Sequence, residues 1–318
     1  MEGAVQSKIR FMSLIGPVLA CVAIVAPASM VKAAPLKTPA ANKGPASLVL
    51  FFTGDGPETL FFQETIKLKK AMEGYKKVVL LKHEKLERWA DLSEADEKIA
   101  DVKDVPTKAK LTNSLRDLAN QGYYIDVWII GHGQDGKFII SDGSYDAPHD
   151  SMTANEIKDL PRATGFTKLP IRMVWSTLCY GSTLNDAWKA AGAKVVGGSR
   201  FVNFYPNQFG RFAEEWNKGH VSYSEAIEKA DTAQSRTVVQ TYLAEIHAPS
   251  KNDKWGKCPF GSTILGDKKC AREYFTKMWL ADNSDWKEGK SGKEFMNYSS
   301  AKIIAGDRAI SKSSAPKW

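Results

Sequence analysis

The stretch IDVWIIGHG, residues 125–133, decides the fold because a nearly continuous apolar run ends in it at a Gly-His-Gly turn. A short apolar run of this kind is typical of a strand buried on both faces of a sheet. The glycines on either side of His132 end the run and leave the histidine just beyond it. We therefore expect a buried strand over residues 125–130, with His132 at its carboxyl end.

Similar apolar runs alternate with helical sequence along the chain. Further strands are expected over residues 47–52, 78–81, 138–140, 171–178 and 194–196. Helices are expected over residues 57–74, 106–122, 183–191 and 209–246. This alternation indicates an α/β fold in three layers, with a largely parallel sheet between helices.

The first 33 residues have the pattern of a secretory signal peptide. Lys8 and Arg10 precede an apolar stretch over residues 11–30, and small residues suited to cleavage stand before Ala34. We expect the mature protein to be exported, periplasmic or secreted, with no stable membrane span once this segment is removed. A lipoprotein processed at Cys21 is the less favoured alternative.

The rest of the chain divides by composition. A linker rich in Pro, Ala and Lys is expected over residues 34–46, an α/β domain over residues 47–248 and a loop-rich extension over residues 249–318. Cys258 and Cys270 flank a turn-rich segment of that extension. Because disulfides are stable outside the cytoplasm, we expect these two to form a local disulfide.

The composition excludes several classes of protein. A net charge of +8 in 318 residues invites a nucleic-acid interpretation, but the basic residues are scattered, so we expect no nucleic-acid partner. The motif G-x-G-x-x-G at residues 131–136 is followed by extended sequence, which disfavours a dinucleotide site. Asp142, Asp146 and Asp150 are of the type that binds calcium but lack the EF-hand spacing, so a solvated loop is preferred and no metal or cofactor is expected.

A cysteine follows the strand expected over residues 171–178, in the same relation to its strand as His132 has to the earlier one. In parallel sheets, reactive groups gather outside the carboxyl ends of the strands. Cys179 becomes an efficient nucleophile if an imidazole takes its proton, and we expect the amides of Gly133 and Cys179 to point at a developing oxyanion. A buried thiol and a structural histidine are the better interpretations for each residue alone, but their joint placement favours a catalytic pair.

The segments VWIIGHG (127–133) and MVWSTLCYGS (173–182) resemble the caspase, legumain, gingipain and clostripain superfamily of cysteine peptidases. The resemblance implies a caspase-like, mostly parallel sheet of about six strands. It also implies that His132 is the general base and acid, that Cys179 is the nucleophile, and that the Gly133 and Cys179 amides form the oxyanion hole. An exported endopeptidase acting on a peptide or protein substrate through an acyl-enzyme is the expected function.

The resemblance also places a substrate pocket. By position it would be formed by Asp55, Thr177 and the stretch with Ser199, Arg200 and Asn203. Asp55 would favour a basic side chain in the substrate and Arg200 an acidic one, so the specificity stays open. For each of these residues a solvated loop position is the competing interpretation.

One departure from the family pattern concerns the residue before the cysteine. The family usually has Ala or Gly there, whereas this chain has Leu178. Leu178 either points into the core, because neighbours along a strand face opposite ways, or marks a remodelled site. The second case predicts a catalytically inactive caspase-like domain that binds a peptide or protein partner.

Overall fold

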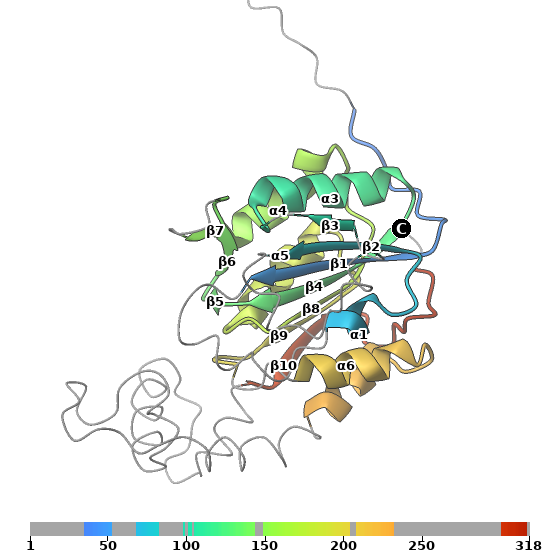
Figure 1. Cartoon of the computed structure of the whole chain (residues 1–318), viewed down its shortest axis with the longest axis vertical. Helices are drawn as coiled ribbons and strands as arrows, with labels where there is room; N and C mark the ends of the chain where they lie inside the picture. Colours follow the sequence, from blue (N-terminus) through green and yellow to red (C-terminus); the bar gives the residue numbers. More distant parts are fainter. Residues whose placement is uncertain are drawn as a thin grey trace, which may run out of the picture. The chain divides into compact units, whose positions relative to one another are not determined.

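A computed structural model describes residues 35–52, 68–82, 98, 101–103, 105–143, 149–203, 208–231 and 300–316 (Figure 1). Over these residues the chain forms an α/β fold with a seven-stranded sheet in the order β10-β9-β8-β4-β1-β2-β3. A smaller sheet has the order β5-β6-β7. The predicted signal peptide, the Cys258–Cys270 pair and Asp55 lie outside the described residues.

The strands of the large sheet are β1 (Pro45–Phe52), β2 (Lys77–Lys82), β3 (Asp101–Lys103), β4 (Tyr124–Gly131), β8 (Ile171–Ser176), β9 (Val195–Ser199) and β10 (Lys302–Gly306). Those of the small sheet are β5 (Gly133–Gln134), β6 (Lys137–Ser141) and β7 (His149–Thr153). The helices are α1 (Leu68–Met72), α3 (Lys108–Asn120), α4 (Ala154–Thr164), α5 (Asn185–Ala191) and α6 (Gln208–Asn217), with a 3-10 turn η3 (Gly181–Leu184) and a further helix over residues 223–231.

The large sheet is parallel except at one edge. Five neighbouring pairs of strands run parallel, and β10 pairs antiparallel with β9. This confirms the mostly parallel α/β fold, but the described part of the sheet has seven strands instead of about six. Two strands of the large sheet, β3 and β10, were not predicted, and the strand expected over residues 138–140 belongs to the small sheet as β6. The expected boundary at residue 248 is corrected, because residues 302–306 belong to the large sheet and not to a separate loop-rich extension. Likewise β1 already begins within the expected linker, at Pro45.

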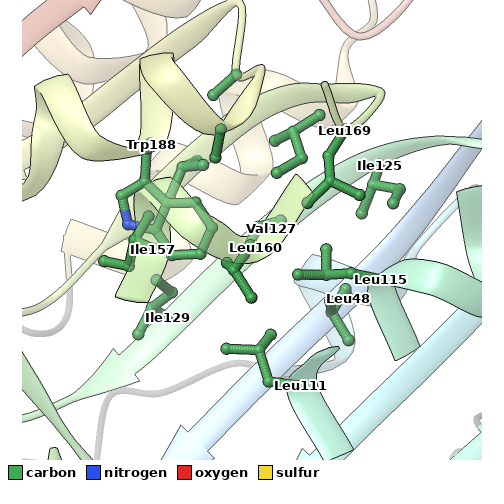
Figure 2. Packing of buried hydrophobic residues seen from close by; sticks show 14 of the residues in the cluster. Leu48, Leu111, Leu115, Ile125, Val127, Ile129, Ile157, Leu160, Leu169 and Trp188 are labelled. Atoms are coloured by element: carbon green, nitrogen blue, oxygen red, sulfur yellow. The ribbon is translucent and has the colours of Figure 1, made fainter. Parts of the chain in front are cut away.

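Side chains alternate cleanly between the two faces of the sheet because successive residues of a strand point to opposite sides. Along β4, Val127 and Ile129 pack in one cluster, and Trp128 and Ile130 pack in another. The first cluster contains the apolar faces of α3, α4 and α5, and Figure 2 shows Leu111, Leu115, Ile157, Leu160 and Trp188 meeting the strands there. The second contains residues of α1, α6 and helix 223–231. Helices thus cover both faces of the sheet (Figure 1), as the apolar runs indicate.

Two helical segments differ from expectation. Helix α4 was not predicted, because Pro161 lies inside it; it begins at a capping box in which Thr153 and Glu156 exchange hydrogen bonds. The long helix expected over residues 209–246 is interrupted: α6 ends at Asn217, and Gly219 has φ +83°. A residue with positive φ cannot continue a right-handed helix, so the chain turns before helix 223–231. Residues 232–246 lie outside the described part.

A buried ion pair joins β4 to β8 at the amino ends of these strands. Asp126 and Arg172 are both fully buried, and Arg172 Nε donates to Asp126 Oδ1 at 2.8 Å. Arg172 also donates to the carbonyl oxygen of Lys312, and its guanidinium lies 5.2 Å from the ring centroid of Trp216. This pair fastens the C-terminal segment to the edge of the sheet opposite His132.

Candidate active site

His132 and Cys179 follow the carboxyl ends of two neighbouring strands, β4 and β8. The strands are in register with Ile129 opposite Ser176, and the pairing continues past β8 because the Thr177 N–H donates to the Ile129 carbonyl at 2.9 Å. The Gly131 N–H in turn donates to Thr177 Oγ1 at 3.0 Å. The segments that follow β4 and β8 therefore leave the sheet side by side. This places His132 and Cys179 at the same edge, beyond the carboxyl ends of these parallel strands.

Gly133 lies directly against the turn that carries Cys179. A methyl group added at Gly133 would be 2.5 Å from the Cys179 carbonyl oxygen, 2.9 Å from Leu178 Cβ and 3.4 Å from the Cys179 amide nitrogen. Only glycine permits this approach, because real Cβ atoms do not come so close to a main chain. The two residues whose amides were expected to form an oxyanion hole are thus in main-chain contact.

The hairpin β5–β6 holds the backbone at His132 and at the residue after it. The Ile139 N–H donates to the His132 carbonyl at 2.9 Å, and Gly133 pairs with Phe138 in the β5–β6 register. At the tip, the Gly136 N–H donates to Thr183 Oγ1 at 2.9 Å. The hairpin is therefore anchored to η3, the turn that follows Cys179, so the two halves of the site are joined by hydrogen bonds.

Cys179 is half-buried, and its sulfur accepts a hydrogen bond from the Asn203 N–H at 3.4 Å. The Asn203 side chain donates to the Thr177 carbonyl at 2.7 Å. These two bonds hold the loop after β9 against the loop after β8. An N–H group directed at sulfur favours the thiolate over the thiol, because hydrogen bonding to the charged form stabilises it.

A strained residue follows the cysteine. Tyr180 has φ +54°, and among the described residues no other non-glycine has a positive φ. Its N–H donates to the Phe201 carbonyl at 2.7 Å, which fixes the turn against the same loop after β9. Backbone strain of this kind costs on the order of 1 kcal/mol or more and is concentrated at functional sites.

Leu178 points away from this edge, into the core. It is 1% exposed and belongs to the hydrophobic cluster that also contains Phe138 and Leu184. The strand expected over residues 171–178 ends at Ser176, so Leu178 and Cys179 lie in the segment beyond it, where Leu178 is buried and Cys179 is half-buried. The leucine that stands in place of the family's Ala or Gly is therefore packed in the core. This is the first of the two alternatives that the sequence left open.

A buried lysine that sequence reasoning missed lies at the same edge. Lys302 is 8% exposed, its Nζ donates to Ser199 Oγ at 2.6 Å, and it lies 4.9 Å from the ring centroid of Trp175. Burial lowers the pKa of Lys302 to about 8, against the opposing effects of Asp231 and Cys179. The sequence carried no signal for it, because Lys302 falls within the expected loop-rich extension.

Asp231, at the end of helix 223–231, is the acidic partner of this lysine. Burial raises the pKa of its carboxyl to about 6, and the charge of Lys302 opposes that rise. Gln208 Nε2 donates to Asp231 Oδ1 at 2.7 Å. Lys302, Ser199, Asp231 and Gln208 form a polar cluster, here called the lysine cluster, between the sheet and the helices that cover one of its faces.

The residues expected to line the substrate pocket are distributed unevenly. Thr177 and Ser199 are buried. The Thr177 hydroxyl accepts a hydrogen bond from the Gly131 N–H, and the Ser199 hydroxyl accepts one from Lys302 Nζ, so both hydroxyls are engaged inside the protein. Arg200 is half-buried, and its N–H donates to the Ala301 carbonyl at 2.9 Å. Asp55 is not among the described residues.

Other kinds of site find no support in the described ranges. Within them, no group of three or more His, Cys, Asp or Glu residues is arranged to hold a metal ion. Asp150 of the acidic loop instead forms an ion pair with Lys108 at 3.0 Å. Across the same residues, no helix combines the length and the apolar character needed to cross a membrane.

No protein-family model matches the sequence, and no curated protein matches it either. The functional interpretation therefore depends on the geometry of the strand ends and on the chemistry of the residues placed there.

Proposed function

We propose that this protein is an exported cysteine endopeptidase with a caspase-like fold, in which Cys179 and His132 form a catalytic dyad. The observation that carries the proposal is the main-chain contact between Gly133 and Cys179 at the ends of adjacent parallel strands. It supports the proposal because it joins the segments that carry His132 and Cys179, and a thiol, an imidazole and two backbone amides are the groups that acyl transfer requires.

The reaction follows from the roles of these groups. His132 takes the proton of the Cys179 thiol, and the sulfur attacks the peptide carbonyl carbon, forming a C–S bond. The amides of Gly133 and Cys179 stabilise the negative charge that develops on the carbonyl oxygen. The tetrahedral intermediate expels the amine, which receives the proton from His132. A water molecule deprotonated by His132 then hydrolyses the thioester and releases Cys179.

Three features support the caspase-like assignment. The sheet is mostly parallel with helices on both faces, the two reactive residues follow neighbouring central strands, and glycine follows the histidine where the two chains meet. The burial of Leu178 removes the strongest argument for a remodelled, inactive site. A noncatalytic domain that binds a peptide or protein partner is thus the outcome that the experiments must exclude.

Alkylation of Cys179 by iodoacetamide in the native protein tests the dyad. We expect fast labelling in the wild-type protein and labelling at least about tenfold slower in His132→Ala, because the thiolate is the reactive form. His220→Ala is the matched control, since His220 is exposed and bonds only locally to the Lys218 carbonyl. Labelling that is slow in the wild type and becomes complete only on unfolding would contradict the proposal.

A further inference from the structure

Lys302 reaches the candidate active site from the edge strand of the sheet. In the antiparallel register of β9 and β10, Lys302 is opposite Ser199, the last residue of β9. The preceding residue, Gly198, is packed against the main chain of Gly181, two residues after Cys179. A continuous line of contacts therefore runs from the lysine cluster to the turn that holds the nucleophile.

The surroundings of the ammonium group favour a retained positive charge. Its Nζ donates to a serine hydroxyl and lies over the face of Trp175, and an aromatic face attracts a cation. Burial lowers the pKa of Lys302 to about 8, and the Asp231 and Cys179 anions oppose that decrease. Near neutral pH the group is accordingly mostly protonated, and its charge is poorly screened because water is excluded.

Among the described residues, charged and titratable side chains near the carboxyl ends of β4, β8 and β9 come from several elements. They include His132 after β4, Arg200 after β9, Asp231 at the end of helix 223–231 and Lys302 on β10. Asp231 accepts a hydrogen bond from Gln208, and the charges of Asp231 and Cys179 both oppose the effect of burial on the pKa of Lys302.

We propose that Lys302 is a positioning residue that stabilises the thiolate form of Cys179 and thereby sets the reactivity of the nucleophile. Its part in catalysis depends on the proposed peptidase function, but its effect on the thiol does not. Lys302 acts through its charge, because its ammonium group favours the thiolate of Cys179 in the pair of Cys179 and His132. The Asn203 N–H donates a further hydrogen bond to the Cys179 sulfur.

The test is the pH profile of iodoacetamide labelling of Cys179 from about pH 5 to 10. In Lys302→Met we expect the midpoint to move upward by about one pH unit, so that labelling at neutral pH is about tenfold slower. Lys302→Arg keeps the positive charge and should restore most of the wild-type profile.

Lys312→Met is the matched control for loss of a C-terminal anchor. Lys312 Nζ bonds Asn217 Oδ1 at 2.7 Å, and burial likewise lowers its pKa to about 8, but it lies beside Arg172 at the opposite edge of the sheet. This variant should lose stability without moving the labelling profile. An unchanged profile in folded Lys302→Met, or the same shift in both variants, would overturn the proposal.

A second variant keeps the test decisive if Lys302→Met does not fold. Ser199→Ala removes the hydroxyl that holds the ammonium and should move the midpoint in the same direction by a smaller amount; an unchanged midpoint would overturn the proposal. A Lys302-dependent profile in a protein that cleaves no peptide would support the thiolate stabilisation and contradict the peptidase. Peptide cleavage together with a labelling profile that does not depend on Lys302 would support the peptidase and contradict the thiolate stabilisation.

Discussion

Gly133 and Cys179 meet through their main chains, and a single methyl group at Gly133 would be 2.5 Å from the Cys179 carbonyl oxygen. This contact joins the two strand ends on which the proposed chemistry depends. It explains why a glycine follows His132, because a side chain at this position would collide with the Cys179 main chain and with Leu178. The contact also makes the site sensitive to very small changes.

Gly133→Ala should disable the site with a modest loss of stability. Because main-chain atoms must move apart, we expect a loss of about 1–3 kcal/mol in the free energy of unfolding. Peptide cleavage should fall about 100-fold, because a shift of about 1 Å misplaces reacting groups. Urea unfolding and kcat/KM measure the two effects. Gly136→Asn is the control in the same hairpin, since Gly136 has φ +68° with open space around it and Asn tolerates that conformation. Equal losses of activity in both variants would contradict this account.

Leu178→Ala should damage the core and leave the thiol chemistry intact. Leu178 is almost fully buried in the main hydrophobic cluster, so the truncation should cost about 2–5 kcal/mol in the free energy of unfolding. The labelling rate of Cys179 in the folded variant should stay within about twofold of wild type, because Leu178 points away from the thiol. Leu178→Met, which nearly conserves volume, should lose much less stability. A gain in activity in Leu178→Ala would instead show that the bulky residue restrains the site.

Arg172→Met should destabilise the protein without changing the site. Removing Arg172 leaves the Asp126 carboxylate buried without its positive partner and with only the hydrogen bonds from Tyr75 and Trp216 among the described residues, which typically costs about 3–5 kcal/mol. In the double variant Asp126→Leu and Arg172→Met, most of this loss should be recovered, because no charge is then left buried. Thermal unfolding of the single and double variants measures the recovery, and a double variant less stable than Arg172→Met would contradict it.

The lysine cluster predicts a specific dependence of stability on pH. Burial lowers the pKa of Lys302 to about 8 from its ordinary 10.5, so between these values the unfolded chain binds a proton that the folded chain does not. The contribution of Lys302 to stability therefore increases as the pH rises from 8, by up to about 3 kcal/mol in total.

This dependence is measured in a Cys179→Ala background, so that the thiol does not titrate. The two proteins compared are Cys179→Ala and the double variant that also carries Lys302→Met, each unfolded in urea at about pH 7 and pH 10. From the lower to the higher pH, the free energy of unfolding of Cys179→Ala should increase relative to that of the double variant. A stability difference between the two variants that is the same at both pH values would show that Lys302 titrates normally.

The parts of the fold that the sequence predicted are those governed by local pattern. Strands such as β4 and β8 are buried on both faces, so their apolar runs identify them whatever the rest of the chain does. The helix α4 was missed because Pro161 and its charged residues conceal the apolar face. The edge strand β10 is short, and its pairing with β9 connects segments far apart in the chain, which no local pattern reveals.

The residues of the candidate site likewise divide into those that a local sequence pattern predicts and those that it does not. His132 and Cys179 were found because each follows an apolar strand within a few residues, and parallel strands bring their carboxyl ends to one edge. Asn203 was expected in the pocket, but its hydrogen bond to the Cys179 sulfur uses the main-chain N–H, which every residue except proline has and no side chain announces. Lys302 was missed because it lies on the missed strand β10. Thr177 and Ser199 were expected from the resemblance to line a pocket, but their hydroxyls hold strand ends together, a role that depends on partners distant in sequence.

The most direct test of the central claim is cleavage of a mixed fluorogenic peptide library by the mature, reduced protein, with Cys179→Ala as the control. We predict cleavage that is lost in Cys179→Ala and in His132→Ala, and that reveals the side chain preferred before the scissile bond. If the folded protein cleaved no peptide in a Cys179-dependent way, with or without calcium, the peptidase would be contradicted, and a domain that binds a peptide or protein partner would take its place.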